Sequence, residues 1–386
     1  MIQASKKLSQ LPPYLFVSID QAKRKARAEG RDIIDIGIGD PDLPTPQPII
    51  EALYEAAKDP ANHKYALDQG MSELREKISN WCKNRFSIEL DPTCEIHPLI
   101  GSKEGIAHLP FALLNNGEYV LVPDPSYPPY RNCTILAGGK PFIMPLLEKN
   151  RFLPDLSKIP SKVFKKAKII FINYPNNPTS AVATIEFYKD LVRFALKHKI
   201  VIASDLAYSE LSFDGYLPPS ILEIPKAKDI AIEFHSLSKT FNMTGWRLGW
   251  ACGNKEIVAA LGKFKTNIDS GVFQAIQIAG IAALNMDRSF IKENNKIYAQ
   301  RREVIAKGLT SLGWEVFDTK ATFYVWIKVP VKSSSIDFCK LLLEKCNIVA
   351  TPGVGFGKYG EGYFRMALTV SQSRLEEAIR RISAIK

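Results

Sequence analysis

The segment HSLSKTFNMTGWRLG, residues 235–249, places a lysine between hydroxyl side chains just after an apolar run that we expect to be a strand. The amine of Lys239 can form a Schiff base with a carbonyl, while Ser236, Ser238 and Arg247 can bind a phosphate on the same molecule. A polar loop with a solvated lysine is the alternative, and a lone S-x-S-K would favour it. The added run TGWRLGW favours a binding site.

Outward from this segment, short apolar runs alternate with helical periods over residues 46–285, which predicts an α/β fold with a mostly parallel central sheet covered by helices. The expected strands are Pro98–Ile100, Tyr119–Val122, Ile169–Asn173, Val201–Ala203 and Ile230–His235. After residue 285, a long amphipathic helix over Ser289–Leu312 leads into strands and helices of a different order. We therefore expect an N-terminal arm (1–18), a large domain (46–285) and a smaller α+β domain built from both chain ends (19–45 and 286–386).

The composition excludes several classes of protein. The chain has 386 residues, 46% of them hydrophobic, and a formal net charge of +11, values typical of a globular protein. The basic excess allows a nucleic-acid-binding interpretation, but only residues 1–31 precede the first predicted strand, too few for a separate helix-turn-helix module. We expect no nucleic-acid partner, and the excess charge favours small acidic ligands instead.

The cysteines and apolar runs bear on location and metal binding. The six cysteines form no C-x-x-C pair and no cluster with zinc-ligand spacing, so we expect no metal and a reducing, cytoplasmic location. The N-terminus shows no secretory signal, and no apolar run reaches the length of about 18 residues that a membrane helix needs. We expect a soluble protein without a membrane partner.

Two further motifs follow predicted strands and offer groups for an aromatic ring. In SDLAY, Asp205 can pair with a protonated pyridine nitrogen and Tyr208 can reach a phenolic oxygen, although an Asp that caps the next helix is a common alternative. In NYPNNPT, prolines restrict the loop so that Asn177 can direct its amide at a ligand, although Asn-Pro is also an ordinary turn signal.

Two more motifs offer groups for a ligand that carries both a phosphate and an aromatic ring. In GSKEG, residues 101–105, backbone N–H groups at a predicted strand-to-helix junction can cradle a phosphate. In DPSYP, Tyr127 can stack on an aromatic ring. Any one of these motifs could occur by chance, but five in this order indicate a shared site.

Together these motifs resemble those of the pyridoxal-5′-phosphate (PLP) aminotransferases of fold type I, class I/II, over nearly the whole chain. The resemblance implies PLP as cofactor and a ping-pong transfer of an amino group between an amino acid and a 2-oxo acid. It makes Lys239 the Schiff-base lysine, which moves the substrate proton and needs a lowered pKa from burial and nearby cations. It implies the remaining cofactor contacts as follows: Asp205 to the ring nitrogen, Asn177 and Tyr208 to the phenolate oxygen, Tyr127 on the ring, and Ser102, Lys103, Ser236, Ser238 and Arg247 to the phosphate.

The same resemblance implies residues for the substrate and for a second subunit. Arg365, in GYFRMAL, matches the arginine that clamps the substrate α-carboxylate, and Gly39 leaves its backbone close to that carboxylate. Lys103 and Asn177 would also lie beside the substrate. Tyr65, in HKYALDQG, matches a tyrosine that reaches the phosphate across a dimer interface, so a homodimer with shared active sites is implied.

Within this family, LPPYLF, GSKEG and SLSKTFNMTGWRLGW most resemble the LL-diaminopimelate aminotransferases of lysine biosynthesis, which exchange an amino group between tetrahydrodipicolinate and glutamate. The resemblance implies that Tyr14 reaches the neighbouring subunit's site and that Asp68, where a glutamate is expected, recognises the distal end of the substrate. Asn267 would contact substrate or, alternatively, cap the preceding helix. An alanine–glutamate aminotransferase and, less favoured, a PLP-dependent lyase or decarboxylase remain open as alternatives.

Overall fold

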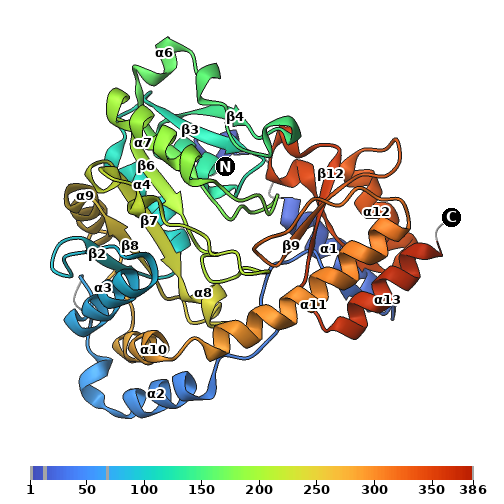
Figure 1. Ribbon diagram of the computed structural model, residues 1–386, viewed down its shortest axis with the longest axis horizontal. Helices are drawn as coiled ribbons and strands as arrows, with labels where there is room; N and C mark the ends of the chain where they lie inside the picture. Colours follow the sequence, from blue (N-terminus) through green and yellow to red (C-terminus); the bar gives the residue numbers. More distant parts are fainter. Residues whose placement is uncertain (1–2, 12–14, 67–68, 385–386) are drawn as a thin grey trace.

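The structure is a computed structural model that describes residues 3–11, 15–66 and 69–384. In these residues, seven strands form one large sheet in the order β2-β8-β7-β6-β5-β3-β4 (Figure 1). All neighbours pair in parallel except β8, which runs antiparallel to both β7 and β2. The strands are β2 (Ile96–Leu99), β3 (Tyr119–Asp124), β4 (Lys140–Pro145), β5 (Ala167–Ile172), β6 (Val201–Asp205), β7 (Ala231–Ser236) and β8 (Gly249–Gly253).

Helices cover both faces of this sheet, which confirms the predicted α/β fold. Alternate residues of β5 point to opposite faces: Ile170 packs in one apolar cluster with Leu191, while Phe171 packs in another with Leu109. The helices of this part are α2 (Gln47–Lys58), α3 (Ser72–Phe86), α4 (Ser102–Leu113), α5 (Pro129–Leu136), α6 (Ser161–Phe164), α7 (Ile185–His198), α8 (Leu237–Thr240), α9 (Lys255–Lys265) and α10 (Gln274–Asn285).

A second apolar cluster joins the two chain ends, with Ile36, Ile305 and Phe364 among its buried members. Its strands form a parallel pair, β1–β10, and an antiparallel sheet in the order β11-β12-β9, of which Figure 1 labels β12 and β9. The elements are β1 (Ile34–Asp35), β9 (Tyr324–Lys328), β10 (Ile348–Val349), β11 (Thr351–Pro352) and β12 (Tyr363–Ala367), with α1 (Leu15–Ala28), α11 (Ser289–Ser311), α12 (Ser335–Cys346) and α13 (Gln372–Ser383). This packing agrees with a small domain from both ends, whose boundaries stay a prediction.

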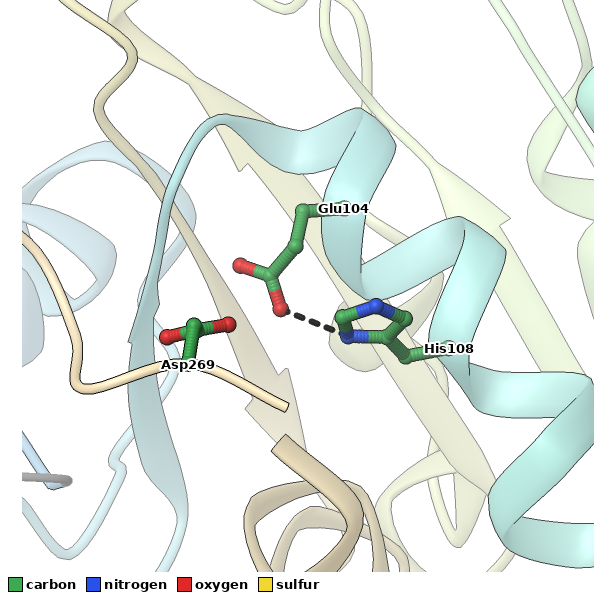
Figure 2. Close-up of side chains that lie close together, drawn as sticks. All are labelled: Glu104, His108 and Asp269. Carbon is green, nitrogen blue, oxygen red and sulfur yellow. Dashed lines mark ion pairs between the residues drawn. The ribbon is translucent and has the colours of Figure 1, made fainter. Parts of the chain in front are cut away.

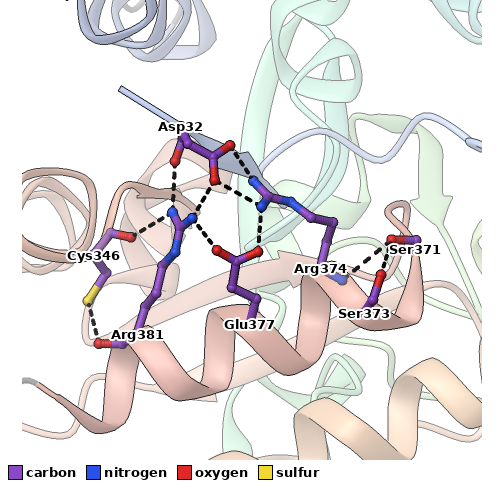
Figure 3. Close-up of polar contacts among 7 residues, drawn as sticks. All are labelled: Asp32, Cys346, Ser371, Ser373, Arg374, Glu377 and Arg381. Carbon is purple, nitrogen blue, oxygen red and sulfur yellow. Dashed lines mark hydrogen bonds and ion pairs between the residues drawn. The ribbon is translucent and has the colours of Figure 1, made fainter. Parts of the chain in front are cut away.

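A network of charges fastens the N-terminal segment to the last helix. The Asp32 carboxylate accepts from Arg374 at 2.7 Å and from Arg381 at 2.5 Å, and Glu377 pairs with both arginines (Figure 3). Arg381 also donates to the Asp32 backbone carbonyl at 2.7 Å. This network links residues that are more than 340 positions apart in sequence.

Several elements differ from the sequence-based expectation. Helix α1 begins at Leu15, within the stretch 1–18 that was expected to be an N-terminal arm. Strands β4 and β8 were not expected, because β4 holds two prolines and β8 begins and ends with glycine. An edge strand tolerates proline, and β4 lies at the sheet edge. Glycine is required at position 249, since a Cβ there would lie 2.5 Å from the backbone carbonyl oxygen of His235. Within the described ranges, the helices are all too short or too polar to cross a bilayer.

Candidate active site

A cavity of about 370 Å³ opens at the carboxyl ends of β5, β6 and β7, where parallel α/β sheets place their ligands. The motifs that lie far apart in sequence meet here because parallel strands end at the same edge. Eleven of the predicted site residues line this cavity: Gly39, Ser102, Lys103, Tyr127, Asn177, Asp205, Tyr208, Ser236, Ser238, Lys239 and Arg247.

Lys239 lies in the short helix α8, directly after β7, and its Nζ donates to the carbonyl of Gly39 at 3.0 Å. Burial lowers the pKa of this amine to about 8. Asp40 opposes the shift, and the cations Arg247 and Arg365 add to it. The prediction of a lowered lysine pKa is confirmed. An amine with this pKa is about one-tenth unprotonated at pH 7, a far larger fraction than for an ordinary lysine, and the unprotonated form is the one that acts as nucleophile or proton acceptor.

Asp205 is the last residue of β6 and is buried. Its Oδ2 accepts a hydrogen bond from the Tyr130 hydroxyl at 2.6 Å, whereas its Oδ1 is buried without a hydrogen-bond partner among the described residues. Burial raises the pKa of this carboxyl to about 6, against the lowering effect of the Tyr130 hydrogen bond. A buried carboxylate oxygen without a partner suits a cationic donor such as a protonated ring nitrogen. The helix-capping alternative fails, since the chain after Asp205 turns without starting a helix.

Tyr208 and Asn177 form hydrogen bonds at the side of the cavity. The Tyr208 hydroxyl donates to the Tyr324 hydroxyl at 3.2 Å. Asn177 accepts from Arg365 Nη1 at 2.6 Å through its side-chain oxygen, and its backbone N–H donates to Asn173 Oδ1 at 2.8 Å. The Asn173 amide in turn donates to the Asp205 carbonyl at 2.7 Å, so these loops hold one another in place.

The GSKEG segment forms the predicted strand-to-helix junction. Gly101 precedes the first residue of α4 and has a φ of 73°, a left-handed conformation that favours glycine. A Cβ on Gly101 would lie 2.3 Å from Arg247 Nη2, so the missing side chain admits the guanidinium. Arg247 Nη1 donates to the Thr244 carbonyl at 2.9 Å. Two cations and free helix N–H groups beside hydroxyls suit a phosphate.

Arg365 is buried in β12, with its guanidinium over the rings of Tyr324 (4.0 Å) and Phe356 (4.6 Å). Besides Asn177, it donates to the Gly37 carbonyl at 2.7 Å, and both acceptors are neutral. Its Nε is buried without a hydrogen-bond partner within the described ranges. Such a guanidinium suits an anionic ligand. Gly39 lies so close to Tyr324 that a Cβ would be 2.0 Å from the tyrosine hydroxyl oxygen.

Two other predicted residues, Tyr65 and Asn267, do not line this cavity. Tyr65 is 88% exposed. Asn267 is exposed and its amide donates to the Lys263 carbonyl at 2.8 Å, a contact that agrees with the helix-capping alternative. Tyr14 and Asp68 lie outside the described residues.

Sequence reasoning missed several residues of the site, among them Tyr130, Tyr324 and Asn173. Tyr130 bonds Asp205 and stacks on Phe171 with ring centroids 4.8 Å apart. Tyr324 and Asn173 line the cavity. Asn173 and Tyr130 lie in or beside motifs already singled out, so their proximity was a usable signal. Tyr324 lies inside an ordinary apolar strand, and its sequence context carries no such signal.

Comparison with known proteins agrees with this geometry. The family model for aminotransferase class I and II matches residues 31–382. The chain belongs to this family. Its cofactor is PLP, and the unpartnered Asp205 oxygen, the Lys239 amine and the cation-lined junction at Gly101 fit that molecule.

Similar proteins span the whole chain. An LL-diaminopimelate aminotransferase of Aquifex aeolicus is 54% identical over all of both chains, and one of Halothermothrix orenii is 53% identical over 97% of each. Among solved structures, substrate-bound BacF of Bacillus subtilis matches with a TM-score of 0.96 at 38% identity, over 100% of this chain and 98% of that one. A mutant aspartate aminotransferase of Thermus thermophilus matches with a TM-score of 0.94 at 27% identity, over 100% of both.

Proposed function

We propose that this aminotransferase is an LL-diaminopimelate aminotransferase of lysine biosynthesis, which interconverts tetrahydrodipicolinate plus glutamate and LL-diaminopimelate plus 2-oxoglutarate. The observation that carries this proposal is identity of 54% with a curated enzyme of that name over the full length of both chains. Transfer of an amino group as such is supported by the site, where an amine with a pKa of about 8 and a buried carboxyl line one cavity.

The cofactor residues have separate tasks in this proposal. When bound, PLP supplies an electron sink for charge that develops at the substrate Cα. Asp205 would hold the ring nitrogen through its unpartnered Oδ1, and Tyr130 keeps that carboxylate in place. Asn177 and Tyr208 would bind the phenolate oxygen, and Tyr127 would cover one face of the ring. Ser102, Lys103, Ser236, Ser238 and Arg247 would hold the phosphate, with Tyr65 of a second copy as a further contact.

Lys239 performs the proton transfer. Its Nζ would take the proton from the substrate Cα. This assignment is supported by the burial that lowers the pKa of the amine and by the hydrogen bond that directs Nζ to the Gly39 carbonyl, beside the expected carboxylate site. With a pKa of about 8, a fraction of the amine is already unprotonated at neutral pH, so no additional base is needed to deprotonate it.

Arg365 binds the substrate α-carboxylate. It is buried, and its hydrogen-bond acceptors Asn177 and Gly37 are neutral, so a carboxylate would supply the missing negative charge. The contact of Asn177 with Arg365 links carboxylate binding to a residue on the cofactor side, and Gly39 and Lys103 complete this end of the site.

We assign recognition of the distal end of the substrate to residues that come together when two copies of the chain form a homodimer. Tyr14, Asp68 and Asn267 would act there, and the high exposure of Tyr65 is consistent with a partner that covers it. A cytoplasmic location stays a prediction from the isolated cysteines, all six of which are free.

The test is a comparison of substrates on the purified holoenzyme. LL-diaminopimelate and L-alanine are each supplied with 2-oxoglutarate, and glutamate formation gives kcat/KM for both. We expect a clear preference for LL-diaminopimelate, because alanine leaves the distal polar groups without partners. A preference for alanine would replace the proposal with an alanine–glutamate aminotransferase, and release of ammonia or carbon dioxide would indicate a lyase or decarboxylase.

A further inference from the structure

A second cluster of polar side chains lies behind the GSKEG junction. Glu104 and His108 on α4 and Asp269 after α9 bring their oxygen and nitrogen atoms within 4.8 Å of one another (Figure 2). His108 Nδ1 lies 2.8 Å from Glu104 Oε1. This geometry is compatible with a metal ion.

A lysine side chain of the same chain already forms ion pairs with this cluster. The Nζ of Lys265, which is only 1% exposed, lies 3.2 Å from Glu104 Oε2 and 2.5 Å from Asp269 Oδ1. The ammonium therefore neutralises both carboxylates. Asp269 Oδ1 also accepts from the Gly271 N–H at 2.8 Å, which ties the turn after α9 into the same group. We therefore assign this cluster a role in holding the chain in place.

The contact that matters for the cofactor is made by the same Glu104 oxygen that faces Lys265. Glu104 Oε2 accepts the backbone N–H of Ile100 at 2.8 Å, immediately before Gly101. Gly101 occupies the N-cap position of α4 and has no side chain that could bond the first N–H groups of the helix. Those N–H groups stay available for a phosphate, and the junction needs another group to hold it.

We propose that Glu104 is a positioning residue for the cofactor phosphate. It fixes the junction Ile100–Lys103 through the Ile100 N–H, and the buried Lys265 holds its carboxylate in the required place. The inference rests on the proposed role of Ser102 and Lys103 in phosphate binding. It does not depend on which amino acid is the substrate.

The experiment compares PLP with pyridoxal, which lacks the phosphate. Dissociation constants of both are measured by absorbance on apoprotein prepared from the holoenzyme, for the wild type and for Glu104→Ala. Loss of a hydrogen bond to a charged group costs enough to weaken binding about tenfold or more. We expect the Kd for PLP to rise about tenfold in Glu104→Ala while the Kd for pyridoxal stays within about twofold.

Two further variants separate positioning from general support. Glu104→Gln keeps an oxygen that can accept from Ile100, and is expected to retain the preference for PLP over pyridoxal to within about threefold. His108→Gln changes only the contact at Oε1 and is the matched control, with the preference unchanged. Equal weakening of both ligands in Glu104→Ala would overturn the proposal, as would a His108→Gln variant that loses the preference to the same extent. Since neither ligand is an amino acid, failure here is distinguishable from failure of the substrate assignment.

Discussion

The inner and the outer parts of the proposed site differ in how one chain builds them. The inner part, around Asp205, Tyr208 and Lys239, lines one cavity, and each of these side chains has a hydrogen-bond partner from the same chain. In the outer part, Tyr65 and Asn267 are exposed and lie away from that cavity. One chain therefore supplies the groups proposed for the cofactor chemistry, whereas the proposed substrate selectivity and the proposed Tyr65 contact with the cofactor phosphate require a second copy.

The largest effect is expected at the centre of the inner part. Lys239→Ala removes the amine that we propose holds the cofactor and moves the Cα proton, so kcat should fall by about 10⁴-fold, the upper end for a general acid–base group. Steady-state turnover with the preferred amino acid measures it. Lys255→Ala, an exposed lysine at the start of α9, is the matched control and should retain wild-type activity. Normal turnover in Lys239→Ala would contradict the proposed catalytic role of Lys239 and of the inner part of the site.

Arg365→Lys tests the boundary between the two parts. The variant keeps the charge but loses the planar two-point fork, so kcat/KM should fall roughly 10–100-fold, mainly through KM for both the amino acid and the 2-oxo acid. The Kd for PLP should stay within about twofold of the wild-type value. A fall in PLP affinity as large as the fall in kcat/KM would place Arg365 with the cofactor instead.

The sequence predicted which segments meet at the cavity. Asp205, Lys239 and Arg247 belong to segments that follow strand ends, and parallel strands bring such segments together whatever their separation in sequence. Their residue types also carry recognisable chemistry. The mostly parallel sheet followed from the alternation of apolar runs and helices for the same reason.

What sequence reasoning missed depends on contacts that leave no local pattern. Tyr324 enters the site because a strand of the chain-end sheet packs beside Gly39, more than 280 residues away in sequence. Strand β4 holds prolines that only its edge position tolerates, and the glycines of β8 reflect close backbone approach. The outer part was inferred by resemblance alone, because one chain does not bring its residues together.

A smaller effect is expected in the outer part. Tyr65→Phe removes only a hydroxyl, and loss of one hydrogen bond to the cofactor phosphate should raise the Kd for PLP by about three- to tenfold. Tyr54→Phe, at another exposed tyrosine, is the matched control and should bind PLP as the wild type does. If sedimentation shows a monomer, or if Tyr65→Phe binds PLP normally, the proposed sharing of sites between copies fails.

The smallest effect is expected outside both parts, in the network around Asp32. Hydrogen bonds from Arg374 and Arg381 hold the pKa of the Asp32 carboxyl below its usual value, so this pairing stabilises the fold above the unfolded-state pKa and is lost as the pH falls through the lowered one. Asp32→Asn should lower Tm slightly at neutral pH, less in high salt, without changing kcat/KM. An equal decrease in Tm at low and high salt would show that the network acts by packing instead of charge.

The most direct test of the proposed LL-diaminopimelate aminotransferase activity is a half-reaction on the purified holoenzyme. LL-diaminopimelate is added without a 2-oxo acid, and the absorbance of the bound cofactor is followed beside a parallel sample with L-alanine. We expect LL-diaminopimelate to convert the cofactor once per site at a far higher rate than alanine at equal concentration, and 2-oxoglutarate to restore the starting spectrum. Faster conversion by alanine, or continued product formation without a 2-oxo acid, would contradict the proposed function.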